Sequence, residues 1–314
     1  MRSKSEKTSW PALLRLAGYS GDNMFLTGYT KEARKRRDKL ATMVIVGLAG
    51  FILLILASLL VYIFAQGISA IDWAFLSQFP RASMTQGGIL PAIVGTLYLA
   101  LGSMAISIPL GFGAAIYLSE YARPGPLVST IRLGVANLAG VPSVVFGLFG
   151  LSLFVTTFGF GRSLLSGCLT LGLLTLPTVT AAAEEALRQT PGSFREAALA
   201  LGANRFQAIR QVILPAAIPG MLTGAILALG RAAGETAPIT LTSATAYSPA
   251  LPDSPFNEAM ALTTHIYNLA TNGANIAGTR PQQFGTALVL MAIVLGLSLV
   301  AVILRARLRR SRRW

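Results

Sequence analysis

An arginine and a glutamate lie four residues apart in a part of the chain that is otherwise apolar. The segment GRAAGETAPIT, 230–240, contains Arg231 and Glu235, with AILAL before it and LTSA after it. Residues i and i+4 share one face of a helix, so the two side chains can pair. A guanidinium is permanently charged, and its planar fork of donors suits a tetrahedral oxyanion. The pattern predicts either a buried structural ion pair or a site where Arg231 attracts an anion and Glu235 limits how tightly it binds.

Neutral polar residues in neighbouring segments suggest a route past this pair. Thr236 follows Glu235 directly, and Asn137 and Ser143 flank a proline in GVPSVVFG, 140–147. Pro142 is expected to break the third apolar run and start a new helix, because an interior proline removes a backbone hydrogen bond and kinks or breaks a helix. This break either exposes a helix N-terminus that attracts an anion, or it is simply a kink in the span. We expect Thr236, Asn137 and Ser143 to offer hydrogen bonds to a passing substrate.

Catalytic chemistry has few candidates in this sequence. His265 is the only histidine and Cys168 the only cysteine, so a zinc site or a Cys–His nucleophile is not expected. No lysine lies beyond Lys39, and none follows a glycine-rich turn of the phosphate-binding type. We therefore expect no metal, no cofactor and no enzyme activity. Any ATP hydrolysis is expected on another polypeptide. His265 is expected in an outer loop, with or without a surface contact to a partner.

The composition indicates the solvent that surrounds these residues. The 314 residues are 53% hydrophobic and only 12% charged, with a mean hydropathy of +0.62. A helix that crosses a bilayer needs about 20 apolar residues. Pro109, Pro142, Pro177 and Pro238 interrupt the inner runs, which membrane helices tolerate. We predict an all-α integral membrane protein with six spans, at 41–65, 89–118, 127–158, 164–190, 216–245 and 284–304.

The basic residues predict the orientation of the spans. The formal net charge is +14. If the N-terminus is cytoplasmic, 22 basic residues are assigned to the cytoplasmic side and three to the outer side of the membrane. Only Arg231 then remains within a span. This asymmetry is typical of a membrane topology signal rather than of nucleic-acid binding. We expect a basic cytoplasmic segment at 1–40, an outer loop at 66–88, a core at 89–304 and a basic cytoplasmic tail at 305–314.

The cytoplasmic loop between the fourth and fifth spans carries the most specific pattern. PGSFREAALAL, 191–201, has helix-start residues followed by alanines and leucines. Gly202 is expected to stop this helix. A second helix, RFQAIRQVIL, is expected to place Phe206, Ile209, Val212 and Ile213 on one apolar face. From spacing alone, the loop is either a connector on the bilayer surface or a docking element for a cytoplasmic protein.

This loop resembles the EAA motif of the permease subunits of ABC importers. The matching residues are Glu196, Ala197, Ala198, Gly202, Leu214 and Pro215, within a loop at 191–215, while Val212 replaces the usual isoleucine. In that family the motif forms the coupling helix that fits a groove on the ATP-hydrolysing subunit. The resemblance implies that Gly202 permits a turn between two helices and that Pro215 fixes the re-entry of the chain into the membrane.

Other segments resemble the phosphate-specific branch of these importers, the PstA type. They are GRAAGETAPITLTSA, the segment 87–122, NLAGVPSVVFGLFGL and HIYNLA. The resemblance implies a type I importer permease fold in the bacterial inner membrane. It also implies a second permease chain, two ATP-binding subunits and an extracytoplasmic phosphate-binding protein as partners. Two alternatives stay open: a permease for phosphonate, sulfate or molybdate, and an autonomous anion channel or secondary transporter.

Overall fold

The computed structural model describes residues 31–310, except 82–83, 85, 249 and 272–277. Side chains are described for 36–307 within that range. Most of the basic segment predicted at 1–40, and the end of the tail predicted at 305–314, therefore lie outside the described residues. The chain divides into two compact units, 1–61 and 62–314.

The described part of the first unit is a single apolar helix. Helix α2, Lys31–Gly67, runs through this unit and ends in the second. Every described side chain from Arg36 to Val61 is exposed, and an 18-residue window of the helix has a mean hydropathy of 3.0. A helix that is apolar on all sides needs lipid or another apolar surface around it. The helix covers the span predicted at 41–65 and extends beyond both of its ends.

Five helices in the described residues are long and apolar enough to cross a membrane. They are Arg36–Ala70, Leu90–Tyr121, Leu164–Arg188, Arg205–Gly234 and Arg280–Arg307. The pair Pro126–Ala139 and Ser143–Thr157 is bent by 102° at its break, and it adds a sixth crossing when counted as one broken span. The prediction of an all-α membrane protein with about six spans is confirmed.

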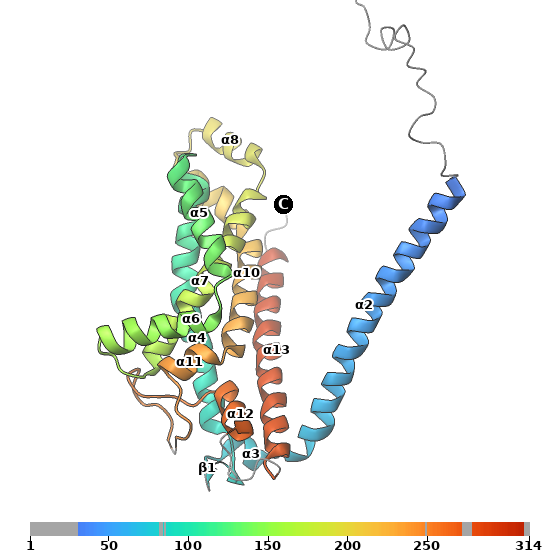
Figure 1. Ribbon diagram of the computed structural model, residues 1–314. Helices are drawn as coiled ribbons and strands as arrows, with labels where there is room; N and C mark the ends of the chain where they lie inside the picture. Colours follow the sequence, from blue (N-terminus) through green and yellow to red (C-terminus); the bar gives the residue numbers. More distant parts are fainter. Residues whose placement is uncertain (1–30, 82–83, 85, 249, 272–277, 311–314) are drawn as a thin grey trace, which may run out of the picture. The chain divides into compact units, whose positions relative to one another are not determined.

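The long helices α4, α7, α10 and α13 form the body of the second unit (Figure 1). Helix α7 packs against both α4 and α10, and α10 also packs against α13. Buried alanines and aliphatic side chains fill the space between α4, α7 and α10. The bounds of these helices are Leu90–Ile116 for α4, Leu164–Arg188 for α7, Leu214–Gly234 for α10 and Arg280–Arg310 for α13.

Small residues allow α7 and α10 to approach closely. A Cβ added at Gly224 would lie 2.3 Å from the Cβ of Ala182, and one at Gly220 would lie 2.7 Å from the Cβ of Ala186. Glycine is therefore required for this spacing, as is common where membrane helices cross. Gly230 is different, because its added Cβ would meet nothing nearer than 3.9 Å.

Prolines have two different outcomes in the structure. Pro109 and Pro177 lie inside α4 and α7, which continue through them. Pro142 instead precedes α6, Ser143–Gly150, after α5, Pro126–Ala139, has ended. Pro238 lies in the first turn of α11, Ala237–Thr242. The helix break predicted near Pro142 is confirmed. The fifth span, predicted at 216–245, corresponds to the helix Arg205–Gly234, so it begins and ends earlier in the chain than predicted, because α10 ends at Gly234.

The loops gather at two opposite ends of the second unit (Figure 1). At one end lie α3, Trp73–Ser77, the hairpin of β1, Pro80–Arg81, and β2, Gln86–Gly87, and helix α12, Leu262–Thr271. At the other end lies α8, Gly192–Ala200. The short elements η1, Ile68–Ala70, η2, Tyr117–Tyr121, η3, Leu151–Thr157, α9, Arg205–Ala208, and η4, Ile209–Ile213, complete the unit.

Candidate functional site

Arg231 and Glu235 form an ion pair at the end of α10. Arg231 Nε lies 3.2 Å from Glu235 Oε1, and the exposed fractions of the two side chains are 36% and 15%. Glu235 caps the helix with an extended backbone, ψ 141°. The two residues were expected on one continuous helix, but the helix stops between them. Thr263 Oγ1 of α12 donates a 2.9 Å hydrogen bond to the Glu235 carbonyl, which lies outside the helical hydrogen-bond ladder.

A hollow of about 330 Å³ begins at the residue after this pair. Thr236, Ala237, Thr240 and Leu241 line it from the start of α11, Val144 lines it from α6, and Tyr267 from α12. Neither Arg231 nor Glu235 is among the lining residues. The hollow therefore lies next to the ion pair along the chain, because Thr236, which lines the hollow, directly follows Glu235.

Asn137 and Ser143 lie on the two sides of the break between α5 and α6. Asn137 is exposed near the end of α5, and Ser143 is half-buried at the start of α6. In the described part of the chain, neither side chain hydrogen-bonds to Arg231, Glu235 or Thr236. The structure thus brings Thr236 next to α6 through Val144, but it does not assemble all of the predicted polar residues into one contact group.

The predicted coupling segment, residues 191–215, forms a helix, a turn and a second helix. Helix α8 ends before Gly202, whose φ of +85° is a left-handed conformation that favours glycine. Asn204 then starts α9 with a reciprocal cap: it accepts from Gln207 N at 2.9 Å, and its own N–H donates to Gln207 Oε1 at 2.8 Å. The two helices and the stop at Gly202 agree with the sequence prediction.

The surface of this segment is partly apolar. Glu196 and Ala197 are exposed, Ala198 is buried, and Leu201 is 89% exposed. A hollow of about 400 Å³ lies between α8 and the start of α10. Its lining residues are Phe194, Ala197, Ala198, Leu201, Val212 and Ala216. The segment therefore presents both a charged helix face and an apolar recess.

The second helix of the segment differs from its expected pattern. Ile209 and Ile213 are buried, but Phe206 is 60% exposed. A π-helical turn, η4, occupies Ile209–Ile213 and changes the residue spacing around the helix. Phe206 is consequently rotated out of the apolar face. Leu214 packs against the buried cluster that contains Ile209 and Ile213, and Pro215 lies in the first turn of α10, within a helix that runs continuously from Arg205 to Gly234.

Glu120 anchors the coupling segment, and the sequence analysis missed this residue. Its side chain is 2% exposed and receives two hydrogen bonds from Arg195 of α8: Nη2 to Oε1 at 2.6 Å and Nε to Oε2 at 3.1 Å. Arg205 donates to the Glu120 backbone carbonyl. Arg205 also lies over the ring of Tyr121, 5.5 Å from its centroid. The signal in the sequence was a lone acid in YLSEYA, where the second span ends.

A second group of charges joins α5 to α7 near the same end. Glu184 Oε1 accepts from Arg132 Nε at 2.7 Å and from Arg188 Nη2 at 3.0 Å. Arg132 Nη2 also donates to the Leu118 carbonyl in η2 at 2.8 Å. Arginine–carboxylate contacts therefore join α5 to α7 and η2 to α8, and Arg132 links the two groups through the Leu118 carbonyl.

His265 is not a surface residue. It lies in α12 with only 3% of its surface exposed, and its Nδ1 has no hydrogen-bond partner in the described residues. Burial lowers the pKa of His265 to about 4, so the imidazole is neutral near pH 7. Within the described ranges, no three His, Cys, Asp or Glu residues are grouped as metal ligands.

Known proteins resemble this chain over most of its length. It is 36% identical over 251 residues to the probable ABC transporter permease protein YqgI of Bacillus subtilis, covering 76% of this chain and 85% of that protein. It is 38% identical over 228 residues to the phosphate transport system permease protein PstA 1 of Mycobacterium tuberculosis, covering 72% of each. A bacterial alginate ABC transporter, solved with an alginate pentasaccharide-bound periplasmic protein, has a similar fold, with a TM-score of 0.62 over 85% of this chain and 93% of that chain at 16% identity.

A family model covers more than half of the sequence. Residues 107–314 match the model described as a binding-protein-dependent transport system inner membrane component. This match includes the coupling segment and the Arg231–Glu235 pair. Together with the identity to YqgI, it shows that the chain belongs to this family of inner membrane components and is a permease subunit of an ABC importer.

Proposed function

We propose that this permease moves inorganic phosphate into the cytoplasm, driven by ATP hydrolysis on separate subunits. The observation that carries the proposal is the Arg231–Glu235 pair at the end of α10, beside a hollow that begins at Thr236. The similarity to a phosphate transport permease supports phosphate as the substrate. A single arginine does not by itself separate phosphate from sulfate, so the choice of oxyanion depends on that similarity.

The geometry of the pair suits an anion that must bind and leave. A lone charge in the middle of a bilayer costs about 2.5–3.5 kcal/mol on insertion scales, which favours pairing of the two side chains. The Arg231 side chain stays 36% exposed, so part of the guanidinium is accessible. Glu235 competes with the substrate for the same donors. This competition keeps binding weak enough for release, as conduction requires.

The coupling segment is the proposed contact with the ATPase. Its exposed residues include Glu196, Ala197 and Leu201, beside the apolar recess between α8 and α10. Glu120 holds this segment to the end of α4 through Arg195. In this proposal, closure of the ATPases on ATP moves α8, and the Glu120–Arg195 contact transmits that movement to the membrane helices.

The proposed complex contains three kinds of partner: a second, related permease chain, two ATP-binding subunits and an extracytoplasmic phosphate-binding protein. Helix α5 has no buried residue, and Leu127, Leu133 and Leu138 are exposed on it. Such a surface suits a second permease chain or lipid. We place α8 and both termini on the cytoplasmic side. The position of α12 at the end opposite α8 supports this orientation (Figure 1).

Transport by the reconstituted complex tests the proposal. Proteoliposomes that contain this chain with its partner permease and ATPases, supplied with ATP and the loaded binding protein, should accumulate labelled phosphate. Sulfate, molybdate and phosphonate should compete poorly. Stronger competition by one of them would assign that oxyanion as the substrate. Uptake by this chain alone, without ATPase subunits, would instead indicate an autonomous channel or secondary transporter.

A further inference from the structure

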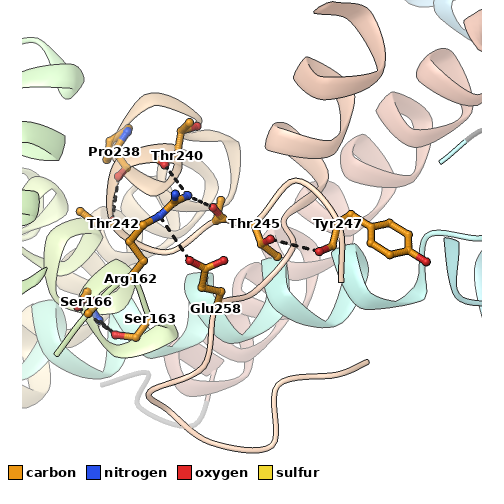
Figure 2. A network of polar contacts seen from close by, with 11 residues as sticks. Arg162, Ser163, Ser166, Pro238, Thr240, Thr242, Thr245, Tyr247 and Glu258 are labelled. Atoms are coloured by element: carbon orange, nitrogen blue, oxygen red, sulfur yellow. Dashed lines mark hydrogen bonds and ion pairs between the residues drawn. The ribbon is translucent and has the colours of Figure 1, made fainter. Parts of the chain in front are cut away.

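Another arginine–glutamate pair lies near the end of the second unit that carries α12. Arg162, just before α7, places Nε 3.6 Å from Glu258 Oε1, as Figure 2 shows. The exposed fractions of the two side chains are 46% and 40%. A loose pair that is half exposed to solvent contributes little to stability. Its charges are therefore available to another partner.

The guanidinium of Arg162 is held in place from one side only. Its Nη2 donates to the Thr240 carbonyl at 3.2 Å and to the Ala244 carbonyl. The neighbouring Ser163 N–H donates to the Thr242 carbonyl at 3.0 Å, which fixes the backbone beside it. In the described part of the chain, Nη1 makes no hydrogen bond. An anchored arginine with free donors is preorganised for an anion.

A polar hollow of about 210 Å³ surrounds this arginine. Its lining includes hydroxyl, amide and carboxylate groups in addition to the guanidinium: Arg162, Thr240, Thr245, Glu258, Tyr267 and Asn268. The guanidinium and the Tyr267 hydroxyl are donors of the kind that bind a small oxyanion, whereas the hydroxyls of Thr240 and Thr245 donate to the carbonyls of Thr236 and Tyr247. Glu258 repels the same anion and so keeps its binding weak.

This hollow shares two lining residues with the one beside the first ion pair. Thr240 and Tyr267 line both of them. The inner hollow begins at Thr236, next to Glu235. Thr240 and Tyr267 therefore border both the hollow at Arg162 and the hollow that begins next to the Arg231–Glu235 pair.

We infer that the hollow at Arg162 is an outer binding station for a small tetrahedral oxyanion on its way to Arg231. The inference rests on the proposed function, because it needs an anion to enter from this end. The two arginine–glutamate pairs then act in sequence. Each offers a guanidinium to the anion, and each carries a carboxylate that promotes its release.

Protection from thiol labelling tests binding at this station directly. The chain has one cysteine, Cys168, which is buried, so labelling of a Thr245→Cys variant of the complex has a low background. Inorganic phosphate should slow the reaction with a charged thiol reagent. Adding Arg162→Gln should abolish this protection, whereas adding Arg280→Gln, an exposed arginine outside the hollow, should not. An absence of protection at phosphate concentrations that saturate transport would overturn the inference.

Glu258→Gln provides a variant with the opposite expected effect. It leaves the hydrogen bonds from Arg162 to the Thr240 and Ala244 carbonyls in place and removes the competing charge. Half-protection should then require about tenfold less phosphate. A requirement for more phosphate would show that the pair only supports the loop, and would also overturn the inference.

Measurements of uptake, ATP hydrolysis and lipid protection distinguish an anion station from a docking contact and from a lipid site. Arg162→Gln should lower ATP-driven phosphate uptake about tenfold while ATP hydrolysis stimulated by the binding protein persists. An equal loss of that stimulation would make the hollow a docking contact for the binding protein. Protection by phosphatidylglycerol vesicles without free phosphate would make it a lipid headgroup site. If wild-type uptake fails but phosphate still protects Thr245→Cys, the transport proposal fails and the anion station stands.

Discussion

At the scale of single residues, Arg231 and Glu235 depend on each other. The Glu235 side chain is only 15% exposed and forms an ion pair with Arg231. Removal of one partner leaves the other charge poorly solvated, which costs more than the net value of the pair. Transport and stability will therefore both respond to substitutions here, and they must be measured separately.

Glu235→Gln removes the negative charge and keeps a side chain of nearly the same size. Arg231 should then hold the anion more tightly and release it more slowly, so we expect phosphate uptake by the complex to fall about tenfold. Arg231→Gln should lower uptake further, because it removes the attraction itself. Thermal unfolding of the purified complex shows whether each variant remains folded. Normal uptake in both folded variants would reduce the pair to a structural role.

His265 predicts a pH-dependent stability of the chain. Its pKa is lowered to about 4 in the folded protein, compared with about 6.5 when unfolded. Between these values the unfolded chain binds more protons, so stability should decrease as the pH falls from 6.5 to 4. The full effect is at most about 3 kcal/mol. His265→Leu should flatten the change in unfolding temperature over this window, and an unchanged slope would assign it to other groups.

At the scale of elements, the position of α8 depends on contacts distant in sequence. Arg195 reaches Glu120, 75 residues earlier in the chain. Glu184 gathers Arg132 and Arg188 beside it. A short helix such as α8 is not stable alone. These contacts therefore determine where the coupling surface lies relative to the membrane helices.

Arg195→Gln tests this anchor. It leaves the buried carboxylate of Glu120 without its main partner, and because Arg195 is 43% exposed we expect a loss of about 2 kcal/mol. Recovery of the ATPase with the purified complex should also fall. Glu120→Gln combined with Arg195→Gln should restore part of the stability. Arg188→Gln is the matched control, since Glu184 keeps its contact with Arg132. Equal losses in Arg195→Gln and Arg188→Gln would contradict the anchor role.

At the scale of the whole molecule, the two ends of the second unit have different surfaces. The end with α8 carries the arginine–carboxylate contacts and the apolar recess. The other end carries α12, the hairpin and the polar hollow at Arg162. This difference between the two ends is expected of a membrane protein that receives a substrate at one end and contacts a cytoplasmic ATPase at the other.

Cysteine accessibility tests this orientation. Leu201 is 89% exposed next to α8, and Phe256 is 57% exposed in the loop before α12. In intact cells, an impermeant thiol reagent should label Phe256→Cys and not Leu201→Cys. Labelling of Leu201→Cys should appear only after the membrane is permeabilised. The wild-type chain, with buried Cys168, is the blank. The reverse pattern would place the coupling segment outside and contradict the proposed ATPase contact.

Local composition made several features predictable. Runs of about 20 apolar residues indicate membrane helices wherever the chain folds, and the helix, glycine turn and helix around Gly202 depend on near neighbours. The spacing of Arg231 and Glu235 likewise anticipates their contact. The register of the helix after Gly202 was less predictable, because the π-helical turn at Ile209–Ile213 changes the spacing that places Phe206.

The sequence by itself therefore determined the membrane class, the number of spans to within one, the two helices around Gly202 and the contact between Arg231 and Glu235, since each depends on residues close together in the chain. Only the tertiary structure decided that α10 ends between Arg231 and Glu235, that His265 is buried, and that Glu120 meets Arg195. The same holds for Arg162, which reaches the Thr240 carbonyl across 78 residues. Such contacts arise from how helices pack, and packing depends on shape and depth that a linear pattern does not contain.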